Sequence, residues 1–205
     1  SIPKNNEYKI IVIDGMYQEE LSNTPSGVLI KKYSDLSEDM RGEFQKAYQG
    51  FDDSDKDVFS SINTINHLEC LTIYVEKNVS IKNKISIFNI IQSAHSSYFR
   101  KSILIKKNSY VSFSEEFLGS TEEISFSNSV SEIFLHENSK LDYFSPQNFK
   151  KNFHFNSINV LQKSNSTSNF HTYSFTGEII RNNLNIKLED KNCYANMYGF
   201  YAVKK

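Results

Sequence analysis

The chain contains two cysteines, Cys70 and Cys193, whose thiols could serve as metal ligands or redox groups. An iron–sulfur cluster usually takes four thiolates, and a structural zinc takes four Cys or His ligands. Two thiols without a C-x-x-C motif supply neither set. Cys193 is expected at a turn-to-strand step, and Cys70 precedes a strand that offers no helix face to bring it to His67. We therefore predict structural thiols at both positions and a reducing compartment.

Five histidines could act as acid–base groups or as metal ligands, but they are dispersed along the chain. His154 and His171 are the pair that neighbouring repeats could bring together, since seventeen residues separate them. A packed or solvated pair is the more common arrangement, so we predict no metal site. The five are His67, His95, His136, His154 and His171.

The sequence lacks the motifs of common catalytic and nucleotide-binding sites. Serine is abundant, but no G-x-S-x-G elbow marks a nucleophile beside a base. There is no G-x-x-x-x-G-K-[ST] loop to hold phosphates and no paired-glycine dinucleotide motif. We therefore predict that the protein is not an enzyme and has no catalytic, cofactor-binding or metal-binding residues. Any ATP-dependent step would come from a partner.

The segment FRKSILIKK, residues 99–107, is a local basic cluster with aromatic residues nearby. It alternates like a strand, and we interpret it as a strand with one solvated, charged face. Over the whole chain, 23 Lys and Arg against 24 Asp and Glu give a net charge of −1, so no overall field attracts nucleic acid or an anionic membrane. The longest apolar runs are strand-sized, and no secretory signal opens the chain.

Residues 1–66 predict a small α+β region. Asp14-Gly15 between two extended runs is a hairpin signal, and GVLI from Gly27 predicts a third strand. Apolar residues at every fourth position predict a helix over residues 35–49, and a second short helix is expected near Asp57–Thr64. The first helix face comprises Leu36, Met40, Phe44 and Tyr48, with Ser34 or Asp35 as the expected cap.

From Leu71 onward, a short strand–turn phrase repeats. The stretches IYVEKNVSI, ILIKKNSYV and IFLHENSKL place Asn78, Asn108 and Asn138 thirty residues apart. Asn tolerates the left-handed backbone conformation at a corner, and Asn residues in register can bond between repeats. Apolar positions of successive phrases would then stack into one core. The matched pairs are Ile73/Val75, Ile103/Ile105 and Ile133/Leu135.

Two further copies of the phrase follow. One begins at Ile158, twenty-five residues after Ile133, with a polar turn in place of Asn, and the last begins at Leu184 with Asn192 in its turn. Repeats of roughly 25–30 residues without a helical pattern match the rungs of a β-helix. We therefore predict an all-β core, a parallel β-helix over residues 67–205. An antiparallel sandwich, in which Lys-Asn is only a favoured turn, is the alternative.

Three phrases resemble the core of the SufB/SufD family, the scaffold subunits of the SUF iron–sulfur cluster assembly machinery. They are NSVSEIFLHENSKLDYFSPQN from Asn128, HFNSINV from His154, and GEIIRNNLNIKLEDKNCYANMYGFYAV from Gly177. The strongest match is R-N-x-L-N-[IV]-x-L at residues 181–188, followed by YGFY. The segment YKIIVIDGMYQEELS, with GVLI and a helix after it, resembles the SufD branch of the family rather than the SufB branch.

This resemblance implies a right-handed parallel β-helix in a non-catalytic scaffold subunit. Such a subunit pairs with a SufB-like paralogue and docks a SufC-like ABC ATPase, and an iron–sulfur cluster is present only transiently in the full complex. The implied location is the cytoplasm, or the plastid stroma in a eukaryote.

The chain also departs from the family pattern. In the family the solenoid continues past YGFYAV to a helical C-terminus that holds SufC, so we expect this chain to stop before the C-terminal half and its last rung to self-associate. The family residues credited with cluster formation lie in that second half, and none is carried over. Arg181, Asn182 and Asn185 match the family pattern, and a structural role at rung corners is expected for them.

Two other hypotheses remain open. A β-helix carbohydrate-active enzyme would need carboxylates clustered along one face, whereas Glu137, Glu189 and Asp190 are expected at turns. A purely structural β-solenoid would need more uniform rungs than this sequence has.

Overall fold

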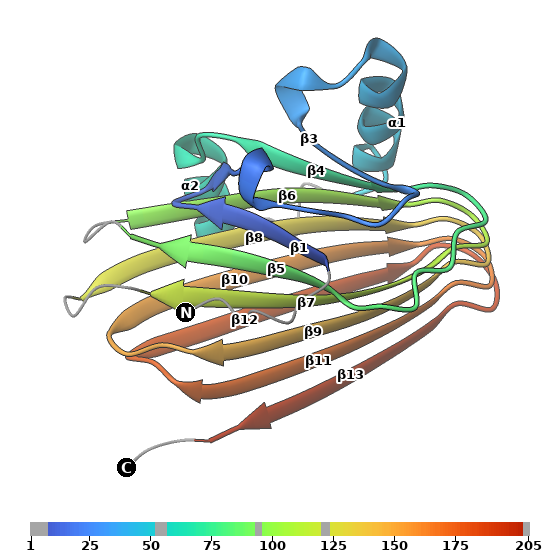
Figure 1. Cartoon of the computed structure of the whole chain (residues 1–205). Coiled ribbons are helices and arrows are strands. Elements are labelled where there is room, and N and C mark those ends of the chain that lie inside the picture. The colour runs from blue at the N-terminus through green and yellow to red at the C-terminus, as the bar shows by residue number, and fades with distance from the viewer. Residues whose placement is uncertain (1–7, 52–56, 93–95, 120–123, 203–205) are drawn as a thin grey trace.

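The computed structural model describes residues 8–51, 57–92, 96–119 and 124–202. Two sheets face each other, and the chain passes alternately from one to the other to form a β-solenoid of about five turns (Figure 1). This confirms the predicted all-β solenoid with a small N-terminal region. The strands pair in parallel, except for antiparallel pairs near the N-terminus.

The first sheet has seven strands in the order β13-β11-β9-β7-β5-β1-β2, and the second has six in the order β12-β10-β8-β6-β4-β3. The strands of the first are β1 Tyr8–Ile13, β2 Met16–Tyr17, β5 Ile85–Ile91, β7 Tyr110–Gly119, β9 Lys140–Asn148, β11 Thr167–Thr176 and β13 Tyr194–Tyr201. Those of the second are β3 Val28–Lys32, β4 Cys70–Val75, β6 Ser96–Ile105, β8 Ser125–Leu135, β10 Asn152–Gln162 and β12 Ile179–Leu188.

An asparagine lies at the corner after each of the strands β4, β6, β8, β10 and β12. All five have φ near +60°, the left-handed region that Asn tolerates better than most residues. The Asn108 amide donates to the Asn78 carbonyl oxygen at 2.9 Å, and Asn138 donates to Asn108 at 3.0 Å. The predicted corner positions of Asn78, Asn108, Asn138 and Asn192 are therefore confirmed. Asn165 adds a fifth corner asparagine, where a different polar turn had been expected.

The apolar core lies between the sheets, with its aliphatic part at the corner end of the strands and Phe99, Phe117 and Phe149 toward the other end. Ile73, Ile103 and Ile133 are in register, and each is at most 1% exposed. The predicted stacking of the first three phrases is confirmed. The expected alignment of Ile158 with Ile133 is wrong by two residues, because Val160 lies opposite Ile133. The missed signal was Asn165, which continues the asparagine column with a spacing of twenty-seven rather than thirty residues.

The N-terminal strands join the same two sheets. β1 and β2 form the hairpin predicted at Asp14-Gly15, and β1 then pairs in parallel with β5. β3 contains the predicted GVLI strand and pairs antiparallel with β4. The division into regions at residue 66 stays a prediction.

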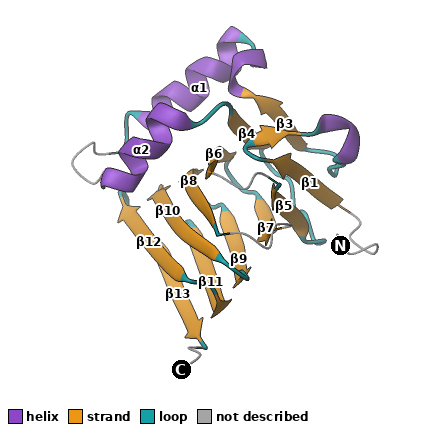
Figure 2. Ribbon diagram, turned by 90° about the vertical axis from the view of Figure 1, so that its left-hand side faces the viewer, coloured by secondary structure: helices purple, strands orange, loops and turns teal. Residues whose placement is uncertain are grey.

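Helices α1 (Glu38–Tyr48) and α2 (Val58–Asn66) lie outside the six-stranded sheet (Figure 2). α1 begins after Ser37, whose hydroxyl accepts from the Met40 N–H, so the expected cap at Ser34 or Asp35 was wrong. Tyr33–Asp35 forms a 3-10 turn instead. Asp57 caps α2 by accepting from the Ser60 N–H. Neither helix is long and apolar enough to cross a membrane, and the described residues contain no other candidate.

Candidate functional site

The interior of the solenoid contains a buried ion pair. The Lys101 ammonium on β6 lies 2.6 Å from a carboxylate oxygen of Glu115 on β7, and the two side chains are 1% and 0% exposed. Glu115 also accepts from the Asn89 amide at 2.7 Å and from the Tyr143 hydroxyl at 2.6 Å. Lys101 donates to the Ser129 hydroxyl at 3.1 Å. Each buried charge is thus paired and also bonded to neutral polar groups, which a charge in a low-dielectric interior requires.

His154 lies in the same interior and is fully buried. Its Nδ1 is 2.7 Å from the Ser127 hydroxyl, which itself donates to the Asn152 side-chain oxygen at 2.8 Å. Because the Ser127 proton is used in that bond, Nδ1 carries a proton and donates to Ser127, and Nε2 is a bare acceptor without a partner among the described residues. Burial, followed by the nearby Lys101 charge, lowers the pKa of His154 to about 3.

A second charged cluster lies on the outer face of the same strands, beneath the helices. Arg100 of β6 pairs with Glu132 of β8, and the two side chains are 6% and 5% exposed. The Tyr48 hydroxyl at the end of α1 bonds both groups and lies 2.5 Å from Glu132. Arg100 also donates to the Thr64 hydroxyl of α2 at 3.2 Å. Burial and the Glu132 charge raise the pKa of Tyr48, which stays protonated. The cluster therefore joins both helices to the sheet.

Helix α2 contacts the sheet through polar side chains and through Phe59, whose ring stacks on Phe155 of β10 at a centroid distance of 3.8 Å. The Asn63 amide donates to the backbone oxygens of Phe99 at 3.1 Å and Asn128 at 3.0 Å, and Asn63 is fully buried. In return, the Asn128 amide donates to the Phe59 backbone oxygen at 2.8 Å. Asn63 thus bonds two neighbouring strands of the sheet at once.

The solvent side of α2 carries large apolar residues among exposed polar ones. Val58, Ile65 and Leu68, in and just beyond the helix, are 63%, 81% and 76% exposed. Val58 and Ile65, seven residues apart, lie on one side of the helix, and Leu68 follows in the chain after the extended C-cap His67. We call these three residues the α2 stripe. A helix that buries Asn and exposes Val and Ile departs from the pattern of an ordinary surface helix, and clustered exposed apolar residues often mark a contact surface.

The two cysteines are free thiols. Burial, as the largest cause, raises the pKa of Cys70 to about 12, so this thiol is not a nucleophile at neutral pH. The Cys193 thiol donates to the Lys163 backbone oxygen at 3.2 Å at a rung corner. In the part of the chain that the structure describes, no group of three His, Cys, Asp or Glu residues could hold a metal ion.

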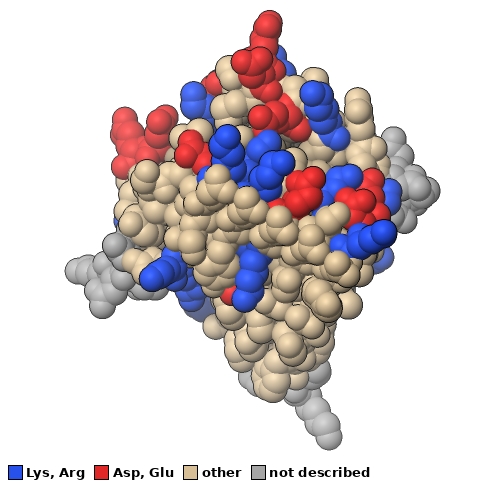
Figure 3. Space-filling model, turned by 90° about the vertical axis from the view of Figure 1, so that its right-hand side faces the viewer, with Lys and Arg blue, Asp and Glu red and all other residues tan. Residues whose placement is uncertain are grey.

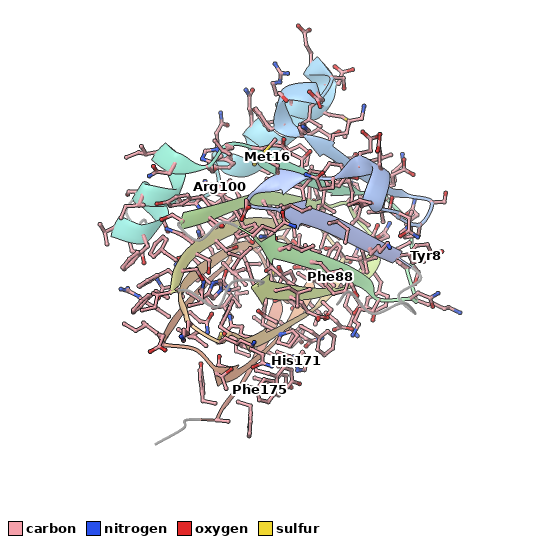
Figure 4. The ribbon with its side chains drawn as sticks, turned by 60° about the vertical axis from the view of Figure 1, so that its left-hand side comes forward. Tyr8, Met16, Phe88, Arg100, His171 and Phe175 are labelled. Carbon is pink, nitrogen blue, oxygen red and sulfur yellow. The ribbon has the colours of Figure 1, made fainter. Side chains whose placement is uncertain are left out.

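The structure does not bring His154 and His171 together. His171 lies on the outer face of β11, stacked between Phe144 and Tyr198 at centroid distances of 4.6 and 4.8 Å, toward the C-terminal end of the sheet (Figure 4). His67 contacts the Asn63 backbone oxygen through Nδ1 at 3.0 Å. At His136, burial and the Lys106 charge lower the pKa. His95 lies outside the described residues.

The prediction of a solvated, charged face for residues 99–107 was wrong. Arg100 and Lys101 are both buried, on opposite faces of β6, because Arg100 meets Glu132 of the neighbouring strand β8 and Lys101 meets Glu115 of β7 in the facing sheet. Figure 4 shows Arg100 at the end of the molecule that carries the helices. The strand therefore contributes one cation to each of the two charged clusters.

Rung corners had been expected for the residues that match the family pattern. The structure places them within strand β12 instead. Arg181 lies 3.5 Å from Asp57 in an ion pair. Asn182 exchanges two hydrogen bonds with Gln147, at 2.7 and 2.9 Å. Asn185 donates to Asn159 at 3.0 Å. All three connect β12 to other parts of this chain.

The last strands of the two sheets carry exposed aromatic and apolar side chains. Several residues of β13 are more than half exposed, and this end of the molecule has few charges (Figure 3). Whether this end self-associates stays a prediction. The exposed residues are Tyr194, Met197, Tyr198, Phe200 and Tyr201.

Two family models match the chain, one after the other. The model described as SufBD protein N-terminal region matches residues 1–87. The model described as SUF system FeS cluster assembly, SufBD core domain, matches residues 88–205, which is more than half of the chain. A search of curated proteins finds no match.

Proposed function

Because this chain belongs to the SufB/SufD family, we propose that it is a SufD-like, non-catalytic scaffold subunit of the SUF system for iron–sulfur cluster assembly. It would pair with a SufB-like paralogue and dock a SufC-like ATPase, in the cytoplasm or in a plastid stroma. The cluster would be cargo of the whole complex and not a resident group of this chain. The observation that carries the proposal is the match of both family regions in the expected order.

The chemistry of the described side chains supports a role without catalysis. The buried charges pair with one another, the Cys70 thiol has a raised pKa, and His154 is neutral and enclosed. The assignment to the SufD branch is supported by the hairpin, the β3 strand and the helix that precede the core. The α2 stripe supports a partner-binding role, because it leaves three large apolar side chains in solvent.

The test is affinity purification of the full-length protein from its native source, with mass spectrometry of the proteins that remain bound. We expect a second SufB/SufD family member and an ATPase with a phosphate-binding loop, in stoichiometric amounts. Recovery of the protein alone, or only with itself, would contradict the proposal and favour a purely structural solenoid. Recovery with polysaccharide and measurable cleavage of it would favour the carbohydrate-active alternative.

A further inference from the structure

A cavity of about 480 Å³ lies between the two helices and the outer face of the six-stranded sheet. It is large enough for a small organic molecule. Three of the ten lining residues are Phe or Tyr, and the other seven all have polar side-chain atoms. The cavity is therefore not purely apolar. The lining residues are Tyr33, Phe44, Gln45, Tyr48, Gln49, Thr64, His67, Cys70, Arg100 and Ser102.

Arg100 provides unused donors in this lining. A guanidinium has five N–H groups. The described bonds use three of them, one to Thr64, one to Tyr48 and one to Glu132. The remaining N–H groups can bond an acceptor in the cavity. Because Glu132 already balances the charge of Arg100, a neutral acceptor fits better than an anion, which Glu132 would repel.

Two side-chain amides lie in the wall that α1 contributes. Gln45 and Gln49 are four residues apart on one side of the helix, and both line the cavity. Each amide offers donors and an acceptor, so the pair can bond a ligand edge that itself carries both. The rings of Tyr33 and Tyr48 supply flat apolar surface beside these groups, whereas Phe44 is packed into the core and offers little.

We propose that this cavity is a binding site for a small, uncharged organic molecule with a flat body and an amide-type edge. The flat body lies against the aromatic rings, and its carbonyl oxygen accepts from Arg100. The amide edge bonds Gln45 or Gln49. The inference does not depend on the proposed role in cluster assembly, since it uses only the cavity and the groups that face it.

Benzamide and benzoate form a matched pair of probes, because they share a ring and differ in charge. Ligand-observed saturation-transfer NMR on the full-length protein should detect benzamide with a dissociation constant on the order of 1 mM, the range for a ligand of this size. Benzoate should bind at least about fivefold more weakly, since Glu132 would repel it. Absence of a saturable benzamide signal, or equal binding of benzoate, would overturn the proposal.

Variants on α1 locate the signal. Gln45→Trp places a large ring at the exposed rim and should abolish benzamide binding, whereas Gln49→Ala should weaken it about threefold by removing one hydrogen bond. Lys46→Trp is the control, because Lys46 is exposed on the same helix and lines a different cavity. Binding that is unchanged in both Gln45→Trp and Gln49→Ala, or is lost equally in Lys46→Trp, would show that benzamide binds elsewhere.

Discussion

The strands β6, β8 and β10 differ between their two halves. Their C-terminal halves are apolar on both faces, with Ile103 and Ile133 inside the solenoid and Leu104 and Phe134 outside under α1. Their N-terminal halves bury polar and charged groups on both faces, beside inner aromatic residues such as Phe99. Lys101 lies inside and Arg100 outside, and Asn63 of α2 bonds the backbone of this half. The C-terminal half, called the apolar half below, is stabilised by apolar burial. The N-terminal half, called the polar half, depends in addition on specific pairs of hydrogen-bonded or charged groups.

This contrast changes what a substitution does. Apolar packing tolerates exchange of similar volumes, whereas a polar group buried next to its partner leaves that partner unsatisfied when it is removed. In the polar half, single changes at the buried polar groups should therefore cost more than an exchange of similar apolar side chains. The helices show the same difference, because α1 buries Phe44 and Ala47 while α2 buries Ser60 and Asn63.

The largest expected effect comes from Lys101→Met. It leaves the Glu115 carboxylate buried without its cation, and breaking a buried pair costs about 4 kcal/mol of unfolding free energy. Urea unfolding measures this loss. Lys107→Met, at an exposed corner position, is the control and should change stability by less than about 0.5 kcal/mol. Equal effects of the two substitutions would show that the polar half is not held by this pair.

Phe44→Ala tests the apolar half. Phe44 is 1% exposed and packs with Leu104 and Phe134, so its truncation should cost about 3 kcal/mol through lost burial and a cavity. Gln45→Ala on the exposed side of the same helix should have little effect. The readout is again the urea midpoint. A loss below 1 kcal/mol, as an order-of-magnitude threshold, would mean that α1 adds little to the core.

Asn63→Ala tests the polar contact of α2. Two backbone oxygens would lose their donor, and we expect a loss of about 2 kcal/mol. Hydrogen exchange should show faster opening of α2 than of α1 in this variant. Asn66→Ala is the matched control, since the Asn66 side chain is exposed and bonds only within the helix. If Asn63→Ala is as stable as Asn66→Ala, the Asn63 hydrogen bonds do not hold α2 on the sheet.

His154 makes stability depend on pH. Its pKa is about 3 in the folded protein, against the ordinary value of 6.5 in the unfolded chain. Only the unfolded chain therefore takes up this proton as the pH falls below 6.5. The contribution is complete above that value and is lost on acidification. Between pH 7.5 and 5.5, the wild type should lose about 1.4 kcal/mol more than His154→Gln does. Parallel pH profiles for the two proteins would be inconsistent with a neutral, buried His154.

The smallest effect on stability is expected at the α2 stripe. Ile65 is 81% exposed, so Ile65→Asp should change the unfolding free energy by less than about 0.5 kcal/mol. If the stripe contacts a partner, the same variant should reduce recovery of that partner in affinity purification several-fold. Asn66→Asp adds the same charge at the next exposed position and should leave recovery unchanged. Equal recovery with both variants would exclude the stripe from the interface.

Much of the apolar half could be predicted from the sequence. The asparagine spacing, the Ile-x-Ile pairs and the four-residue period of the first helix are direct consequences of corner geometry and of strand and helix periodicity. Asn165 was missed because its repeat shortens to twenty-seven residues, which moved the expected register by two positions.

The polar half could be predicted only in part. Alternation from Ile103 and Ile105 places Lys101 on the inner face of its strand, so the burial of Lys101 could be predicted from the sequence. Its partner Glu115 is on a different sheet, and nothing local indicates that pairing. Similarly, the buried residues of the short helix α2, Ser60 and Asn63, are polar, so a hydrophobic pattern does not reveal them. Such contacts depend on which strands become neighbours.

The most direct test of the assigned role is iron–sulfur loading after depletion of this protein in its native cell. We expect proteins that carry iron–sulfur clusters and depend on the SUF system to lose bound iron and sulfide while their polypeptide levels hold. Re-expression of the full-length protein should restore loading. Unchanged cluster content after complete depletion would contradict a role in cluster assembly.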